Sequence, residues 1–161
     1  MTRTLSFVRR VVGPFAALAA VSAVLAAAPP VGGEINVDKD GLALKGYDPV
    51  AYFGEAGKAT KGDAAITAQH AGATYRFATA ENKAAFEKEP AKFVPQYGGY
   101  CAYGVSKGAK YDIEPTAFQV VDGKLYVNYD ASVQKKFTKD PGTFIAKADK
   151  NWDSVKSKPK S

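Results

Sequence analysis

The sequence has only one cysteine, Cys101, and only one histidine, His70, among its 161 residues. A lone cysteine cannot close an internal disulfide bridge, so the disulfide framework of many small exported domains is excluded. The chain also lacks an HExxH zinc motif, a phosphate-binding glycine loop and a second cysteine that would resolve a disulfide. These absences favour a binding function over an enzymatic one.

Beyond the N-terminus the sequence has no apolar run long enough to span a bilayer. The N-terminus itself carries Arg3, Arg9 and Arg10 without an acidic residue, then a small-residue apolar run over 11–27 that ends in three alanines. This order is typical of a secretory signal peptide, which we place at residues 1–28. We therefore expect a periplasmic or secreted protein with no membrane attachment after cleavage. The choice between general secretion and twin-arginine export stays open, although the residues around Arg9 and Arg10 favour general secretion.

The charge balance gives no sign of nucleic acid binding. Lys and Arg total 22 against 16 Asp and Glu, and three of the arginines lie in the predicted signal peptide. Much of the remaining excess lies in the tail, at Lys156, Lys158 and Lys160. With its proline and serines, segment 154–161 has the composition of a disordered basic tail.

Turn and capping signals divide the rest of the chain into short elements. Residues 66–70 and 73–77 alternate around Ala71-Gly72, which predicts a hairpin. Thr79 occupies an N-cap position before a helix over 80–88, and a second short helix follows at 91–94.

The second half of the chain repeats this mixture of elements. The spacing predicts a short helix over 100–107 and a hairpin of 118–121 with 124–128 around Asp122-Gly123. Asp130 caps a helix over 131–139, and a last amphipathic helix begins at Pro141. Hairpins interleaved with short helices indicate an α+β fold, a small single domain with β-hairpins packed against short helices. Residues 29–45 form an N-terminal segment, and 46–153 form the domain, which we expect to be monomeric.

The residues also carry a family resemblance. Asp48-Pro49-Val50, the strand ending Thr74-Tyr75-Arg76-Phe77, and the Glu89-Pro90-Ala91-Lys92-Phe93 segment resemble a YHS domain. With the signal peptide, the Tyr97-to-Tyr103 segment and the Asp122-Gly123 hairpin included, the chain is similar to the stand-alone secreted YHS proteins of Gram-negative bacteria. The resemblance implies a role in metal handling, and relatives of this type are sometimes named as possible selenoproteins.

This chain departs from the metal-type YHS pattern at three positions. That pattern has cysteines where this sequence has Ala51, Ala78 and Asn82. A closed zinc or copper thiolate site needs three or four soft donors and cannot be built there. Metal handling must therefore be argued from the residues that remain.

Cys101 is the first of these residues. A helix over 100–107 places its thiol in the first turn, where free backbone N–H groups and the helix dipole favour the thiolate. We therefore expect a partly accessible thiol of low pKa. Gly98 and Gly99 remove side-chain bulk and let backbone or a ligand come close.

Other polar side chains complete the candidate site. Tyr97, Tyr100 and Tyr103 add hydroxyl groups and ring faces near Cys101. His70 suits copper or zinc as a ligand, although a histidine in a hairpin turn is commonly solvated. Asp48 is a turn-forming residue as well as a candidate ligand. Whether Cys101 and His70 lie close together cannot be decided from the sequence.

The expected function is binding of a soft metal ion, copper first, or of a small ligand at a pocket centred on Cys101. One alternative is a thiol-based redox enzyme or sensor that uses Cys101. The other is a structural or partner-binding domain whose thiol is buried and inert. The identity of the metal, the substrate and any protein partner stay open.

Overall fold

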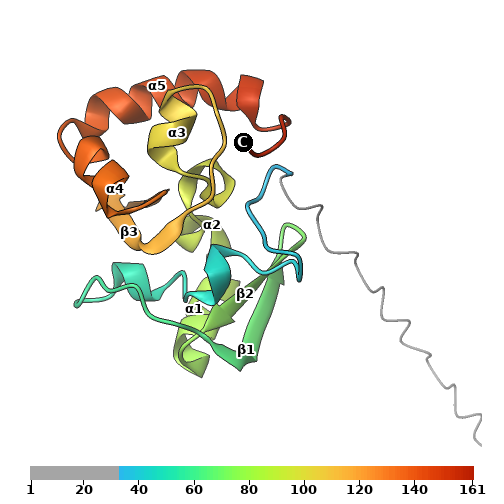
Figure 1. Ribbon diagram of the computed structural model, residues 1–161. Helices are drawn as coiled ribbons and strands as arrows, with labels where there is room; N and C mark the ends of the chain where they lie inside the picture. Colours follow the sequence, from blue (N-terminus) through green and yellow to red (C-terminus); the bar gives the residue numbers. More distant parts are fainter. Residues whose placement is uncertain (1–32) are drawn as a thin grey trace, which may run out of the picture.

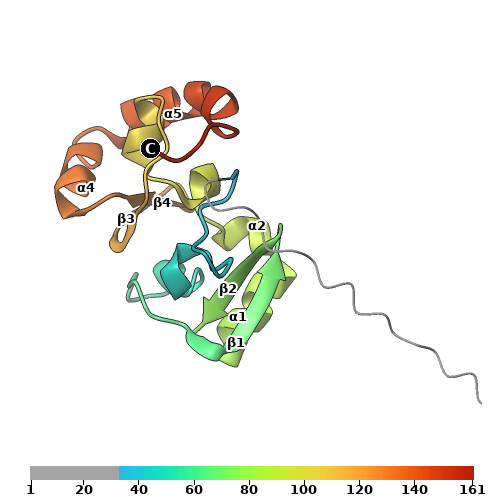
Figure 2. The same cartoon turned by 45° about the vertical axis from the view of Figure 1, so that its right-hand side comes forward.

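The computed structural model describes residues 33–161 and arranges them as two neighbouring groups of elements, seen one above the other in Figure 1 and again in the turned view of Figure 2. The first group contains η1 (Leu44–Gly46), η2 (Ala51–Phe53), β1 (Asp63–His70), β2 (Ala73–Phe77) and α1 (Ala80–Lys88). The second contains α3 (Ala102–Ser106), β3 (Glu114–Val121), β4 (Lys124–Asn128), α4 (Ala131–Phe137) and α5 (Pro141–Val155). Two short helices, α2 (Pro90–Phe93) and η3 (Gln96–Gly99), connect the groups. The predicted signal peptide lies outside the described residues.

Each group is built on one antiparallel hairpin. β1 pairs with β2, with Gln69 opposite Thr74, and β3 pairs with β4, with Gln119 opposite Tyr126. Both turns have positive φ angles at their two central residues, 50° and 70° at Asp122 and Gly123. This is the geometry that a two-residue type I′ turn requires. The hairpins and helices confirm the predicted α+β class.

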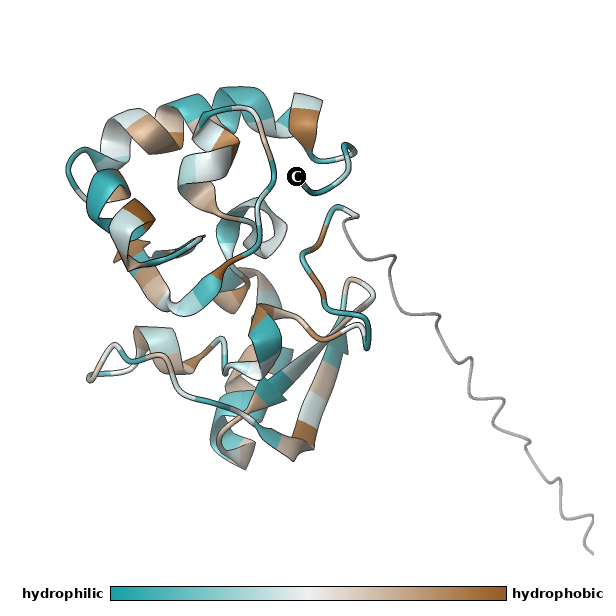
Figure 3. Ribbon diagram, in the orientation of Figure 1, coloured by the Kyte–Doolittle hydropathy of each residue, from teal (hydrophilic) through white to brown (hydrophobic). Residues whose placement is uncertain are grey.

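The helix starts follow local capping signals. The Thr79 hydroxyl accepts a hydrogen bond from the Asn82 backbone N–H at 3.1 Å, and the Asp130 carboxylate accepts one from Val133 at 2.8 Å. The last helix begins at Pro141, as predicted, and apolar and polar residues alternate along it (Figure 3). The predicted helix starts are therefore confirmed. The sequence could reveal them because each depends on residues only a few positions apart.

The C-terminal segment differs from the prediction of a disordered tail from residue 154. α5 continues to Val155, whose side chain is fully buried. Beyond the helix, the Ser161 backbone N–H donates to the Lys110 carbonyl at 2.8 Å. Burial of Val155 and this backbone hydrogen bond hold the segment against the second group, an attachment that a basic composition does not reveal. Within residues 33–161 no helix combines the length and apolar character needed to cross a membrane.

Two clusters of buried side chains form the core. The first fills the space between β1–β2, α1 and the inner face of β4, and it includes Tyr52, Tyr75, Phe77, Phe86 and Cys101. The second lies under α5 and includes Tyr97, Tyr100, Val105, Tyr126 and Phe137. Cys101 and Tyr100 are adjacent in the sequence but contribute to different clusters. The segment carrying the lone cysteine is therefore the seam between the two halves of the core.

Candidate functional site

A groove of about 550 Å³ opens beside this seam. Its walls come from α3, from the loop that follows α3 and from the junction of β4 with α4. The lining residues are Cys101, Tyr103, Gly104, Lys107, Tyr111, Tyr129, Val133 and Ser161. The groove therefore collects three tyrosine rings, a thiol and one lysine from positions spread over the second half of the chain.

Glycine sets the course of the backbone into this segment. Gly98 and Gly99 have φ angles of 61° and 78°, which residues with a side chain rarely adopt. A Cβ atom on Gly98 would lie only 1.9 Å from the Glu34 carbonyl oxygen. The group that approaches Gly98 is thus backbone of the N-terminal segment, whose Asn36 N–H donates to the Gly98 carbonyl at 2.8 Å.

Cys101 is the N-cap residue of α3 and lies just before the helix. The sequence had predicted it inside the first turn of a helix over 100–107. Its sulfur accepts a hydrogen bond from the Gly104 N–H at 3.4 Å, and its side chain is only 1% exposed. Burial raises the pKa of the Cys101 thiol, and the backbone N–H groups of Gly104, Tyr129 and Tyr103 offset this only in part. The expectation of a partly accessible thiol with a low pKa is not met, because desolvation outweighs the helix terminus.

A buried amide next to the thiol was missed by the sequence analysis. The Asn128 side chain is fully buried, and its Oδ1 accepts the Tyr103 N–H at 3.3 Å and lies 3.9 Å from the Cys101 sulfur. Its Nδ2 has no hydrogen-bond partner within residues 33–161. Nothing in the local sequence marks Asn128, because its partners lie 25 and 27 residues away.

The tyrosines predicted near Cys101 divide between the core and the groove. Tyr103 lines the groove, whereas Tyr97 and Tyr100 belong to the second core cluster. The Tyr97 hydroxyl donates to Asp149 at 2.8 Å, and the Tyr100 hydroxyl donates to the Gly33 carbonyl at 2.7 Å. Both hydroxyl groups therefore hold the fold together.

Two tyrosines that the sequence analysis did not single out face the groove instead. Tyr111 and Tyr129 are 40% and 52% exposed, the highest values among the large hydrophobic side chains of the described residues. Their rings meet edge to face, with centroids 6.5 Å apart and an interplanar angle of 78°. Exposed aromatic rings that line a concavity are typical of binding sites.

The lysines near Cys101 have different environments. The Lys107 ammonium lies 5.2 Å from the Tyr103 ring centroid and 5.5 Å from that of Phe144, at the side of the groove. Lys110 is only 1% exposed, and its ammonium donates to the carbonyls of Gly33 and Lys156 at 2.9 and 2.7 Å. Lys110 is thus a structural clamp, whereas Lys107 presents its charge beside the groove.

His70 lies at the end of β1 in the first group. Its ring contacts Phe86 edge to face, with a centroid distance of 5.8 Å, and it is not among the residues that line the groove. Across residues 33–161 no group of three or more His, Cys, Asp or Glu side chains is arranged to hold a metal ion. The groove therefore contains the Cys101 thiol without His70.

Asp48 is fully buried and has a complete set of hydrogen bonds. One oxygen accepts from the N–H groups of Val50 and Ala51, and the other accepts from Ala78 N–H and the Asn82 amide at 2.8 and 2.7 Å. Positions 51, 78 and 82, where the YHS resemblance implies cysteines, therefore surround a single carboxylate. In this chain that place is filled by an internal hydrogen-bond network.

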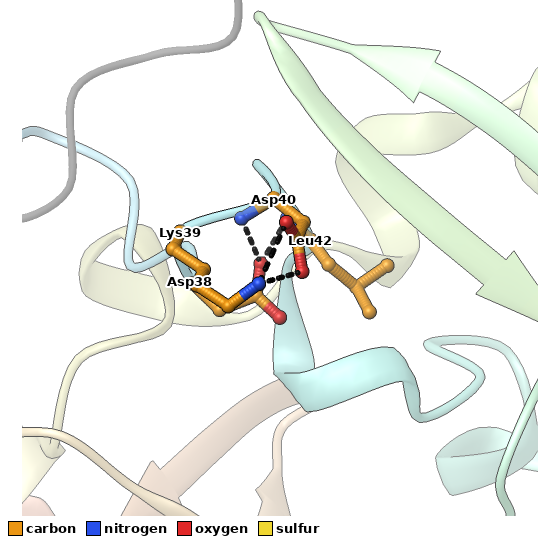
Figure 4. A network of polar contacts seen from close by, with 4 residues as sticks. All are labelled: Asp38, Lys39, Asp40 and Leu42. Carbon is orange, nitrogen blue, oxygen red and sulfur yellow. Dashed lines mark hydrogen bonds and ion pairs between the residues drawn. The ribbon is translucent and has the colours of Figure 1, made fainter.

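A second hollow, of about 230 Å³, has no comparable aromatic wall. One of its sides is the turn at Asp38, whose carboxylate accepts the N–H groups of Asp40 and Leu42 at 2.9 Å each (Figure 4). The carboxylate of Asp112, also in the lining, pairs with Lys45 at 3.2 Å. Its acidic groups are thus engaged by neighbouring residues, which makes the larger groove the better candidate.

The groove wall also contains a sequence pattern that we did not recognise as a possible catalytic motif from the sequence. Residues 104–108 read Gly-Val-Ser-Lys-Gly, the spacing of a nucleophile elbow. Such an elbow needs a strand that leads sharply into a helix with the serine exposed between them. Here Ser106 is the last residue of α3, buried, and its hydroxyl donates to the Tyr103 carbonyl at 2.6 Å. The pattern therefore does not form a catalytic elbow.

Comparisons with known proteins returned no matching family model, no matching curated protein and no matching solved structure.

Proposed function

We propose that this chain is an exported protein that binds a small molecule in the groove beside Cys101. The observation that carries the proposal is the groove itself, a concavity of about 550 Å³ walled by Tyr103, Tyr111 and Tyr129. Small-molecule sites are commonly concavities of roughly 300–1,000 Å³ with apolar and aromatic walls and few polar groups. The groove has both properties.

Cys101 has a different part in this proposal from the one expected of a metal ligand. Its thiol is buried, has a raised pKa and is one of the groups that line the groove, where it acts as a small apolar surface. No second soft donor accompanies it among the lining residues. A small molecule is therefore the better-supported ligand than copper.

The YHS resemblance remains part of the proposal. Its support is spatial: Ala51, Ala78 and Asn82 are far apart in the sequence but all donate to Asp48. In the YHS pattern the cysteines at these three positions would have to lie close together to bind one metal ion, and here the three residues do lie around one carboxylate. We propose that this protein keeps the YHS-like framework and binds its ligand at the groove instead.

The proposal is tested by screening a fragment library against isotope-labelled protein, with amide chemical shifts as the readout. We expect hits to move the signals of Gly104, Lys107, Tyr111 and Tyr129. Tyr129→Ala is expected to weaken these hits, and Tyr129→Phe, which keeps the ring, is the matched control. If no fragment moves these signals, or if Cu(I) binds tightly to wild type and not to Cys101→Ser, the small-molecule proposal is wrong.

A further inference from the structure

We infer that the ligand of the groove is a planar aromatic molecule with a negatively charged group, such as an aromatic carboxylate. This inference rests on the proposed function and adds the chemical class of the ligand. Two features carry it, the charge of Lys107 and the arrangement of the tyrosine rings.

Lys107 carries the only charged side chain among the residues that line the groove. No aspartate or glutamate lines the groove, and no ion pair joins Lys107 to any acidic group within residues 33–161. Lys107 is the C-cap residue of α3, and its ammonium lies over the rings of Tyr103 and Phe144. These contacts hold the cation beside the groove without neutralising it, so an anionic ligand group is favoured there.

The rings favour an aromatic ligand over an aliphatic one. The ring planes of Tyr111 and Tyr129 are nearly perpendicular, at 78°. A ligand that contacts both side chains therefore meets the face of one ring and the edge of the other. Aromatic rings prefer offset or edge-to-face contacts, which contribute about 0.5–1.5 kcal/mol beyond area burial. A flat aromatic ring can make such contacts with both tyrosines at once.

The position of Tyr111 is fixed before any ligand binds. A Cβ atom on Gly104 would lie 2.6 Å from Cδ2 of Tyr111, so the ring packs directly on the helix backbone. The Cys101 N–H also donates to the Tyr111 carbonyl at 3.1 Å, which holds the backbone on the same side. A wall that is already ordered loses little conformational freedom on binding, which favours affinity.

The experiment compares three probes of similar size: 4-hydroxybenzoate, its neutral amide 4-hydroxybenzamide, and the non-aromatic anion cyclohexanecarboxylate. Dissociation constants are measured by chemical-shift titration at low ionic strength. Since a partly exposed ion pair contributes up to about 1 kcal/mol, we expect the benzoate to bind about three- to fivefold more tightly than the amide. The cyclohexane compound is expected to bind more weakly than the benzoate.

Two lysine variants assign the charge preference to one residue. Lys107→Gln is expected to remove the difference between benzoate and benzamide. The matched control is Lys92→Gln, because the Lys92 ammonium also lies over a ring, 5.4 Å from the Phe93 centroid, but outside the groove. In the control the difference should persist.

The outcomes separate this inference from the proposed function. If benzoate and benzamide bind equally to wild type, or if Lys107→Gln keeps the preference, the charged-ligand inference is wrong while the groove remains a binding site. If cyclohexanecarboxylate binds as tightly as the benzoate, the aromatic part is wrong. If no probe and no library fragment moves the groove signals, both the inference and the proposed function fail.

Discussion

Asp48 and Cys101 are both buried residues with polar side chains that precede short helices, but their surroundings differ. The Asp48 carboxylate accepts four hydrogen bonds from its own group of elements. The Cys101 sulfur accepts a long hydrogen bond from the Gly104 N–H at 3.4 Å and lines an open groove. The buried amide beside it, Asn128, has an Nδ2 without a hydrogen-bond partner among the described residues. A polar group with every hydrogen bond satisfied stabilises the fold, whereas one beside an open concavity leaves room for a ligand. Under the proposed function, Asp48 therefore has a structural role, and the surroundings of Cys101 are the place for a ligand.

The largest expected effect comes from breaking the Asp48 network. Asp48→Ala leaves four donors without their acceptor, at least two of which are buried or partly buried backbone groups. Each unsatisfied donor costs about 1–3 kcal/mol, so we expect a loss of at least about 3 kcal/mol in the free energy of unfolding. Urea unfolding followed by circular dichroism measures it. Asp40→Ala, which removes an exposed carboxylate, is the control, and an equal effect for the two would contradict the role of the network.

The next effect is alkaline destabilisation of the same group of elements. Burial raises the pKa of Tyr75 to about 12, and burial also raises the pKa of Tyr52. A folded-state pKa above the unfolded value of about 10 means that this stabilisation is complete below pH 10 and is lost as the pH rises through the folded pKa. At about 1.4 kcal/mol per pKa unit, Tyr75 alone accounts for about 2–3 kcal/mol. The urea midpoint as a function of pH measures the loss, and Tyr75→Phe should reduce its slope.

Cys101 should tolerate replacement far better than Asp48. Serine is a favourable N-cap residue and can keep the hydrogen bond from Gly104, so Cys101→Ser should change stability by no more than about 1 kcal/mol. Cys101→Val, which removes the cap, should cost more. In the wild type, alkylation of the thiol should be slower than that of a free cysteine at the same pH, because the side chain is buried and its pKa is raised. Rapid alkylation near neutral pH would contradict the buried environment.

The smallest effect on stability is expected at the groove wall. Tyr129 is 52% exposed, and exposed positions away from special features usually change stability by no more than about 0.5 kcal/mol. Tyr129→Ala should therefore unfold at nearly the wild-type urea concentration while losing affinity for groove ligands. A large loss of stability would show that the Tyr129 side chain stabilises the fold, as Asp48 does, and would contradict its role as a residue of the groove wall alone.

The sequence predicted the features that depend on neighbouring residues. Thr79, Asp130 and Pro141 mark helix starts through contacts within one turn, and Asp122-Gly123 fixes a hairpin by its backbone angles. Asp48 was predicted to form a turn because it precedes Pro49, and its carboxylate does accept the N–H groups of Val50 and Ala51. Its bonds to Ala78 and Asn82, 30 and 34 residues away, had no local signal.

The candidate site was harder to predict for the same reason. The helix start near Cys101 was predicted two residues too early, at 100 rather than 102. The burial of the thiol depends on contacts with β4, and the groove depends on the positions of Tyr111 and Tyr129, which the local sequence does not reveal. Tyr97 and Tyr100 were near in sequence but turned into the core under α5. Of the residues predicted around Cys101, only Cys101 and Tyr103 therefore line the groove.

The clamp at Lys110 has a consequence for the order of folding. Its ammonium bonds Gly33 and Lys156, which lie 77 and 46 residues away in opposite directions along the chain. Contacts of such long sequence separation form slowly, because a long loop must close before any of them stabilises the chain. The β1–β2 hairpin and α1 rest on local contacts and can form early, whereas the Lys110 clamp cannot close until the segment around residue 156 has been synthesised. In a growing chain the segment around Gly33 therefore stays without the Lys110–Lys156 half of this clamp until residue 156 has been made.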